Sequence, residues 1–349
     1  MLCMTTVPDR ARVRLPGISS RAYEHPADRS ALVALRKLTG FDALFRRLAS
    51  LFSDRSLRLL FLASSVRATQ EQFPQLHQLL LDGASILDLP EVPELFISQD
   101  PIPNAMALGS DKPFIVITTG LVDLLDTEEM RFVIGHELGH VLSGHTVYRT
   151  MLYKLTQLAA RVAWFAIAYI GLKVFVAALE EWYRKSELSC DRAGLLAGQD
   201  PAAGRRALMK TAGGSRMSEL SHDEFLRQAE EYDAVADVRD SVIKLLMLLG
   251  TTHPFAVVRF AELDRWVSEG EYEAILDGDY PRREDDQDAS VRDEAKSAAQ
   301  SYQDSWNRSA DPLMGMVKDF AGSAAGAGGK LFDGLFGRPA SGGSGDPDD

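Results

Sequence analysis

The amino-acid sequence predicts an α+β protein that is mostly helical, with a small β-sheet next to one central helix. Apolar residues recur at helical spacing over several long stretches of the 349 residues. Two short apolar runs, residues 95–98 and 114–119, instead have the length and composition of strands. A helix predicted over residues 126–145 follows the second run directly, so we expect the sheet and this helix to be neighbours.

Composition and charge are those of an ordinary globular protein, with 46% hydrophobic and 25% charged residues. The net charge of −12 argues against a nucleic-acid-binding surface, so we expect no nucleic-acid partner. Cys3 and Cys190 cannot build a disulfide framework, and the amino end has no apolar core long enough for a secretory signal. We therefore expect a cytoplasmic protein, free or associated with the inner face of the membrane. No particular oligomeric state is predicted.

The chain divides into four segments. Residues 1–27 are interrupted by prolines and are predicted to be irregular, and residues 28–90 are predicted to form helices that pack on the core. Residues 91–277 carry the motifs described below and form the predicted catalytic domain. Residues 278–349 are first highly charged and then rich in Gly and Ala, so they are expected to be largely disordered.

Between the two apolar runs, residues 104–109 are a candidate third strand at the edge of the sheet. A short helical segment over residues 121–125 connects the sheet to the central helix. Asp126 followed by Glu129 is the pattern of a capping box, which marks the start of that helix.

The central helix contains a His-Glu-x-x-His motif at residues 136–140. His136 and His140 lie about 40° apart around a helix, and two imidazoles on one face can bind one metal ion. Glu137 is beside them and can move a proton. An alternative interpretation is two surface histidines on an ordinary helix. We disfavour it because burying such polar side chains without a partner is unfavourable, and the flanking residues are apolar: Phe132, Val133, Ile134, Val141 and Leu142.

Catalytic zinc needs three protein ligands and one position left open for water. Glu187 is the strongest candidate for the third ligand, because Arg184, Glu187 and Asp191 form one stripe at helical spacing. We expect Glu187 to bind zinc and Asp191 to orient a ligating histidine through its second ring nitrogen. Arg184 would balance the carboxylates. An exposed stripe of ion pairs is the alternative interpretation of this spacing.

Two further histidines are weaker candidates for the third ligand. His145 lies about 140° around the helix from His140 and points away from it, which is typical of a helix-end residue or of one that supports a ligand. His222 lies in a polar stretch and is predicted to be a surface residue at the start of a helix.

Residues 162–179 are apolar apart from one lysine, and on length alone they are a borderline membrane span. A single span would place Glu187 across the bilayer from His136. Two spans need about 40 apolar residues plus a turn, whereas only 41 residues of any kind separate His145 from Glu187. We therefore predict an apolar helical hairpin over about residues 150–186. It is either buried in the core or in peripheral contact with a membrane surface.

A further hydrogen-bond donor would stabilise the charge that develops on a scissile carbonyl. His253 and Arg259 are candidates, six residues apart at the start of a predicted helix. Their spacing alone favours a different interpretation, a helix-capping histidine and a surface arginine.

Taken together, the motifs resemble those of the HtpX-like and CAAX prenyl protease family of zinc metallopeptidases, which are gluzincins. The resemblance covers roughly residues 95–259. It rests on four segments in the same order: Asn104-Ala105-Met106-Ala107, Gly135-His136-Glu137-Leu138-Gly139-His140, Arg184-x-x-Glu187-x-x-x-Asp191-Arg192 and His253-Pro254-x-x-x-x-Arg259.

The resemblance implies a zincin-like core that holds one Zn²⁺ per chain. It implies His136, His140 and Glu187 as zinc ligands, Glu137 as general base and Asp191 as support for a ligand. It also implies that four further residues line the substrate cleft: Asn104, Ala105, His253 and Arg259. For His253 and Arg259, this reverses the interpretation that spacing alone favours.

The family resemblance further implies a metalloendopeptidase whose polypeptide substrate lies extended along the edge strand near Asn104. The chain lacks the several clear spans of the integral membrane members. This favours a soluble or peripheral protease, with a role in protein quality control or processing near a membrane. The alternative hypothesis is a non-catalytic scaffold whose metal only stabilises the fold and which docks partners or lipid through residues 162–179 and the carboxyl tail. Glu137 disfavours it, because a structural metal site needs no base.

Overall fold

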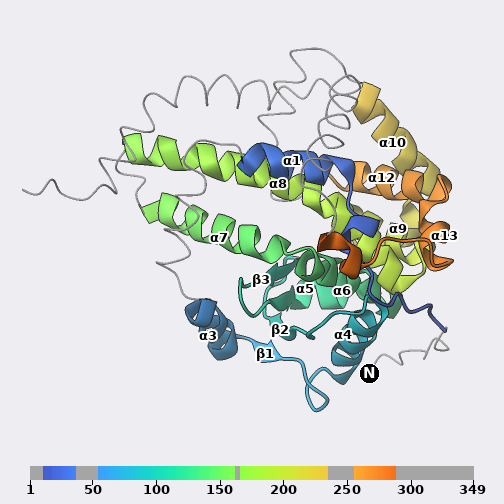
Figure 1. Ribbon diagram of the computed structural model, residues 1–349, viewed down its shortest axis with the longest axis horizontal. Helices are drawn as coiled ribbons and strands as arrows, with labels where there is room; N and C mark the ends of the chain where they lie inside the picture. Colours follow the sequence, from blue (N-terminus) through green and yellow to red (C-terminus); the bar gives the residue numbers. More distant parts are fainter. Residues whose placement is uncertain (1–10, 37–53, 162–165, 235–254, 288–349) are drawn as a thin grey trace, which may run out of the picture.

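The structure is a computed structural model that describes residues 11–36, 54–161, 166–234 and 255–287 of the chain. His253 and the tail from residue 288 onward lie outside these ranges. The predicted class is confirmed, because helices surround one small mixed sheet (Figure 1).

The described part of the chain contains a four-stranded sheet with the order β1-β2-β4-β3. Strands β2 and β4 are parallel, whereas β1 and β3 are antiparallel to their neighbours. All five residues of β4 are buried, as its uninterrupted apolar sequence predicts. The three predicted strands are present, with β3 at the edge, and only the shortest strand was not predicted. The strands are β1 (Val66–Arg67), β2 (Glu94–Ser98), β3 (Ala105–Leu108) and β4 (Phe114–Thr118).

Helix α6 (Thr127–Leu142) follows the sheet through the short helix α5 (Thr119–Leu124). The predicted capping box is present: the Asp126 side chain accepts hydrogen bonds from two backbone N–H groups, and the Glu129 side chain accepts one from Asp126 N. Most of α6 is buried, and its main neighbour is the long helix α8 (Ala166–Gly198).

Helices α6 and α8 approach each other closely because small residues face each other between them. A Cβ at Gly135 would lie 2.4 Å from the Cβ of Ala197, and a Cβ at Gly139 would lie 2.6 Å from that of Ala193. Neither position has room for a larger side chain. The two glycines therefore bring the helix with the His-Glu-x-x-His motif against the helix that carries Glu187.

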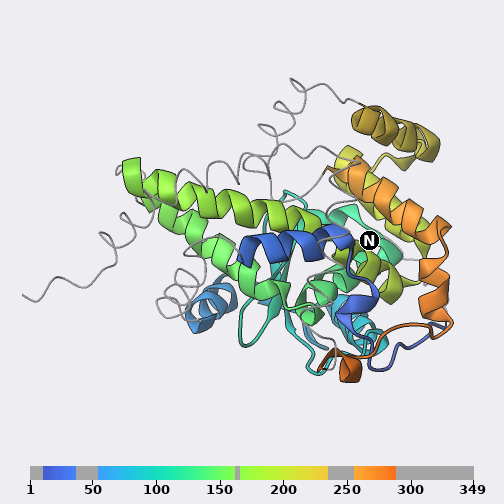
Figure 2. The same ribbon diagram turned by 45° about the horizontal axis from the view of Figure 1, so that its top comes forward.

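Helix α7 (His145–Arg161) begins after Gly144, whose positive φ of 69° lets the chain turn out of α6. The segment predicted as an apolar hairpin lies on α7 and α8, which extend side by side beyond the sheet (Figures 1 and 2). Helix α1 (Pro26–Arg36) packs on α8, and its Leu35 joins a buried apolar cluster with residues of both long helices. Within the described ranges, no helix combines the length and apolar character that crossing a membrane requires.

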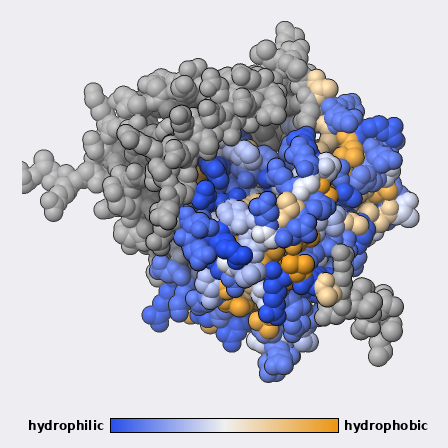
Figure 3. Space-filling view, turned by 45° about the vertical axis from the view of Figure 1, so that its right-hand side comes forward, coloured by the Kyte–Doolittle hydropathy of each residue, from blue (hydrophilic) through white to orange (hydrophobic). Residues whose placement is uncertain are grey.

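The remaining helices cover the sheet and the inner end of α8. Helix α4 packs against α6, and α12 packs against α8 and α9. Hydrophilic residues predominate in the coloured part of Figure 3, where apolar residues form only small separate areas. These helices are α3 (Asp54–Ser64), α4 (Pro74–Ile86), α9 (Pro201–Gly213), α10 (His222–Ala234), α12 (Ala256–Ser268) and α13 (Glu271–Leu276), with 3-10 turns at Ser20–Ala22, Met217–Glu219 and Arg283–Gln287.

Residues 279–287, which the sequence assigns to the carboxyl tail, contact the amino-terminal segment. The backbone N–H of Arg283 donates to Gly17 O at 2.8 Å, and the Ser19 hydroxyl donates to the Asp286 carboxylate at 2.8 Å. Ile18 and Arg282 form an isolated β-bridge. The two ends of the described chain are thus held together.

Candidate metal centre

Three buried side chains from two helices converge on one point. His136 and His140 come from α6, and Glu187 comes from α8. The Nε2 atoms of the two histidines lie 3.2 Å apart, and Glu187 Oε1 lies 3.1 Å from His140 Nε2. Glu187 Oε2 lies 3.5 Å from His136 Nε2. One ligand atom from each residue lies within 4.8 Å of the others, so a single ion can contact all three.

This donor set fits a zinc ion. Two imidazole nitrogens and a carboxylate that meet inside the protein offer lone pairs to a shared cation. Two histidines and one glutamate are also a ligand set of catalytic zinc sites, which keep a fourth position open. The chemistry of these three side chains therefore agrees with the metal that the motif predicts.

Asp191 and Arg259 hold the outer side of His136. Asp191 Oδ1 lies 3.0 Å from His136 Nδ1, and the Arg259 guanidinium donates to both carboxylate oxygens of Asp191 at 2.8 and 2.6 Å. Burial alone would raise the pKa of Asp191, but Arg259 and His136 outweigh it and bring the pKa below its ordinary value. Asp191 is therefore placed as an ionised acceptor that fixes the ring of His136.

Arg184, which was predicted to balance the carboxylates, pairs with Glu181 through contacts of 2.5 and 3.2 Å. Side chains on a helix lean toward its amino end, and Glu181 lies one turn in that direction. The guanidinium beside Asp191 and Glu187 comes instead from Arg259 on α12, whose Nη1 lies 3.5 Å from Glu187 Oε2. Arg259 is thus a partner of the carboxylates rather than a surface residue.

Glu137 is buried and lies against Arg149 of α7. Arg149 Nη1 donates to Glu137 Oε2 at 3.1 Å, and its Cζ lies 4.7 Å from the centre of the Tyr183 ring. Burial raises the pKa of the Glu137 carboxyl above its ordinary value, although Arg149 opposes the rise. Sequence reasoning missed Arg149. The only signal was one charged residue within the first turns of a helix that continues into the apolar hairpin.

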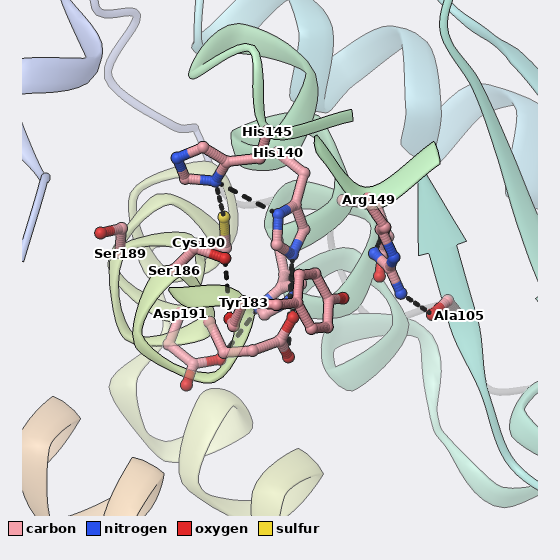
Figure 4. A network of polar contacts seen from close by, with 12 residues as sticks. Ala105, His140, His145, Arg149, Tyr183, Ser186, Ser189, Cys190 and Asp191 are labelled. Carbon is pink, nitrogen blue, oxygen red and sulfur yellow. Dashed lines mark hydrogen bonds and ion pairs between the residues drawn. The ribbon is translucent and has the colours of Figure 1, made fainter. Parts of the chain in front are cut away.

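The edge strand β3 turns part of its backbone toward this site. Asn104 O accepts a hydrogen bond from Thr118 N, so the Asn104 carbonyl faces β4. Because backbone groups alternate along a strand, those of Ala105 and Ala107 face the open edge. Arg149 Nη2 donates to Ala105 O at 3.1 Å (Figure 4). The backbone of Ala107 lies near the Glu137 carboxylate and helps to lower the pKa of that carboxyl against the effect of burial.

Of two further histidines, His222 lies at a helix start as predicted, but His145 does not lie on the central helix and does not point away from His140. The central helix ends at Leu142, and the turn at Gly144 brings the His145 ring back toward His140. His145 is buried at the start of α7, and its Nδ1 lies 3.3 Å from Nδ1 of His140 (Figure 4). Glu187 contacts the other ring nitrogen of His140, Nε2. His222 begins α10, and its side chain is 40% exposed. His253, predicted to line the cleft, lies outside the described residues.

Comparison with known proteins places this arrangement in a family. The model of "Peptidase family M48" matches residues 70–267. The plastoglobule-localized metallopeptidase 48 of the chloroplast of Arabidopsis thaliana is 34% identical over 283 residues, which are 76% of this chain and 81% of the relative.

Two microbial proteases are similar over a shorter range. Protease HtpX homolog 2 of Methanosarcina mazei is 27% identical over 254 residues, 66% of this chain and 84% of the relative. A protease HtpX homolog of Moorella thermoacetica is 28% identical over 257 residues, with the same coverage of 66% and 84%. No solved structure matches the chain significantly. The chain belongs to peptidase family M48 and is an HtpX-like metallopeptidase, as the order of its four motifs predicted.

Proposed function

We propose that this peptidase is a zinc-dependent endopeptidase that holds one Zn²⁺ through His136, His140 and Glu187. The observation that carries the proposal is the convergence of these three donors within 4.8 Å, next to the buried Glu137. The membership of family M48 supports the same conclusion independently of the geometry.

Zinc held by these three residues would supply a Lewis acid, which would polarise a peptide carbonyl and lower the pKa of water. Glu137 is the residue we assign as general base. Its carboxylate takes the proton of the attacking water and then delivers it to the leaving amine. Burial favours this role, because a carboxyl whose pKa lies above its ordinary value holds the accepted proton more readily.

Arg149 supports Glu137 from the other side. Its guanidinium donates to the Glu137 carboxylate and so keeps that carboxylate from turning away from the site. Its positive charge also lowers the pKa of Glu137 against the effect of burial. The base therefore stays ionised over a wider range of pH.

We further propose that the substrate binds in an extended conformation along β3. The backbone groups of Ala105 and Ala107 face the open edge of the sheet, where a peptide strand can form main-chain hydrogen bonds. Arg149 donates to the Ala105 carbonyl in this structure. A substrate strand that pairs with Ala105 would therefore displace or share that contact.

The direct test compares the wild type with Glu137→Gln on a peptide whose two ends are blocked. We expect Glu137→Gln to keep its zinc but to cleave at least about 100-fold more slowly, because an amide cannot accept the proton. Cleavage inside the blocked peptide by the wild type would identify an endopeptidase.

Glu181→Gln is the matched control, since Glu181 is also buried and pairs with an arginine of α8, but lies a turn or more away from the metal ligands. Its cleavage rate should stay close to that of the wild type. Undiminished cleavage by Glu137→Gln would contradict the proposed mechanism.

A further inference from the structure

We propose that Asp28, on the amino-terminal helix α1, is a positioning residue for the metal centre. It holds the ring of His145, and His145 in turn holds the ring of His140. The inference rests on the proposed function, because it gives Asp28 a role toward a zinc ligand.

The first link joins the two histidines. His140 turns its Nε2 toward His136 and Glu187, and its Nδ1 lies 3.3 Å from His145 Nδ1. At this distance one nitrogen must donate a proton and the other must accept it. A neutral His140 that binds metal through Nε2 carries its proton on Nδ1. His140 is therefore the donor and His145 the acceptor.

The second link joins His145 to helix α1. When Nδ1 of neutral His145 accepts a hydrogen bond, the ring carries its proton on Nε2. That atom lies 3.3 Å from Asp28 Oδ2, and Asp28 is only 1% exposed. Each ring in the chain thus has one tautomer fixed by the next residue, and the chain ends on a buried carboxylate.

Asp28 is itself held rigidly by helix α8. Trp182 Nε1 donates to Asp28 Oδ1 at 3.0 Å, and the Ser189 hydroxyl donates to Asp28 Oδ2 at 2.7 Å. With His145, the carboxylate receives donors from two helices. A carboxylate fixed in this way sets the direction of the His145 ring rather than following it.

The two zinc-ligating histidines are therefore supported in different ways. His136 is held directly by Asp191, whereas His140 is held by Asp28 through the interposed ring of His145. Both arrangements end on a buried carboxylate, the usual partner of a ligating histidine. Asp28 lies outside residues 70–267, which the family model matches, so a segment that precedes the matched region completes the site.

A second metal ion is the competing explanation of the same cluster. Cys190 Sγ lies 3.6 Å from His145 Nδ1, and ligand atoms of His140, His145 and Cys190 lie within 4.8 Å of one another (Figure 4). A metal there would require His140 to bind metal through both ring nitrogens at once. The hydrogen-bond chain needs no such doubly deprotonated ring, and the stoichiometry of zinc distinguishes the two.

The test measures zinc affinity in the full-length protein by competition with a chromophoric chelator. We expect Asp28→Asn to weaken zinc binding by about 10- to 100-fold, which is the usual effect of losing such a partner. Melting temperatures are measured with and without zinc. The melting temperature of the zinc-free protein should fall less than that of the zinc-loaded protein.

Glu129→Gln is the matched control, because it makes the same carboxylate-to-amide change at a buried site. Glu129 is bound by Arg206 and Lys210 and has no link to His140. This variant should lower both melting temperatures alike and leave zinc affinity unchanged. A purely structural role of Asp28 would give the same result as Glu129→Gln and would overturn the inference.

A double variant tests the chain itself. Adding Asp28→Asn to His145→Phe should weaken zinc binding no further than His145→Phe alone, because the second link is already lost. If the two substitutions instead weaken zinc binding independently, the inference is overturned, and two zinc ions per wild-type chain would also overturn it.

If Asp28→Asn does not fold, Ser189→Ala replaces it. We then expect a smaller loss of zinc affinity, and an unchanged affinity would contradict the proposal. A wild type without zinc would instead overturn the proposed function.

Discussion

Arg149 contacts both the proposed base and the carbonyl of the edge strand, so it links the pH dependence of catalysis to substrate binding. Burial raises the pKa of Glu137 and Arg149 lowers it. Removing the guanidinium in Arg149→Met should therefore raise this pKa further. Because Glu137 acts in its ionised form, the acidic limb of the profile of kcat/KM against pH should move to higher pH.

Arg131→Met is a suitable control for that experiment, because it removes another buried guanidinium, one on α6 that pairs with Asp82 of α4 instead of Glu137. Its acidic limb should coincide with that of the wild type. An unshifted limb in Arg149→Met would show that Arg149 does not act on the base.

His136 makes a second prediction at the scale of one residue. Burial lowers its pKa, but Glu187 and Asp191 raise it more, to about 9 from its ordinary 6.5 in the protein without metal. The imidazolium therefore stabilises the metal-free fold fully below pH 6.5, and this contribution is lost as pH rises through about 9. Zinc needs the lone pair of this ring, so binding at pH 7 should expel about one proton.

Calorimetry in buffers of different ionisation enthalpy counts the released protons. The number should fall as pH rises from 7 toward 9, because a growing fraction of His136 is already neutral before zinc binds. Zinc binding at pH 7 without proton release would contradict the assignment of His136 as a charged group in the metal-free protein.

At the scale of helices, the contact between α6 and α8 determines whether the site can close. Alanine is ordinarily favoured over glycine inside a helix. At Gly135, however, alanine should destabilise the protein, since the added Cβ would lie 2.4 Å from that of Ala197 and 3.1 Å from Gly194 Cα. We expect Gly135→Ala to lose about 1–3 kcal/mol of stability in denaturant unfolding and to bind zinc more weakly.

The double variant Gly135→Ala with Ala197→Gly restores part of the space and should recover part of the stability. A Gly135→Ala variant as stable as the wild type would show that the close approach of the helices does not depend on this glycine.

The sequence predicted elements well where one local signal sufficed. The uninterrupted apolar run of β4 and the capping box at Asp126 are local patterns, and both are present. The two-residue strand β1 was not predicted, because its pairing with β2 depends on the tertiary fold. The same difference between local and tertiary contacts applies to the site. Helix geometry alone predicts that His136 and His140 lie on one face, whereas the pairing of Asp191 with Arg259 depends on the tertiary fold.

Arg259 shows this limit most clearly. It lies 68 residues after Asp191 and reaches it only because α12 packs on α8, so spacing could not predict the pair. The family resemblance singled out Arg259 only as a residue that lines the substrate cleft. Arg149 and Asp28 had no such help, since both meet their partners through helix packing alone. Buried polar residues on helices that also carry long apolar stretches were the only signal that could have drawn attention to them.

At the scale of the whole molecule, the metal centre depends on two long antiparallel helices that bring distant residues of the chain together. His140 and Glu187 are 47 residues apart, and the chain between them runs out along α7 and back along α8 (Figure 1). Segments far apart in the sequence also support the site, from α1 near the amino end to α12. The proposed zinc site is therefore a property of the assembled fold rather than of the His-Glu-x-x-His helix alone.

The zinc content of purified Glu187→Ala, measured by elemental analysis beside the wild type, tests this account most directly. His222→Ala serves as a control, because it removes a partly exposed histidine outside the cluster. We predict one zinc ion per chain in the wild type and in His222→Ala, and little or none in Glu187→Ala. Full zinc occupancy in Glu187→Ala would contradict the assignment of Glu187 as the third ligand.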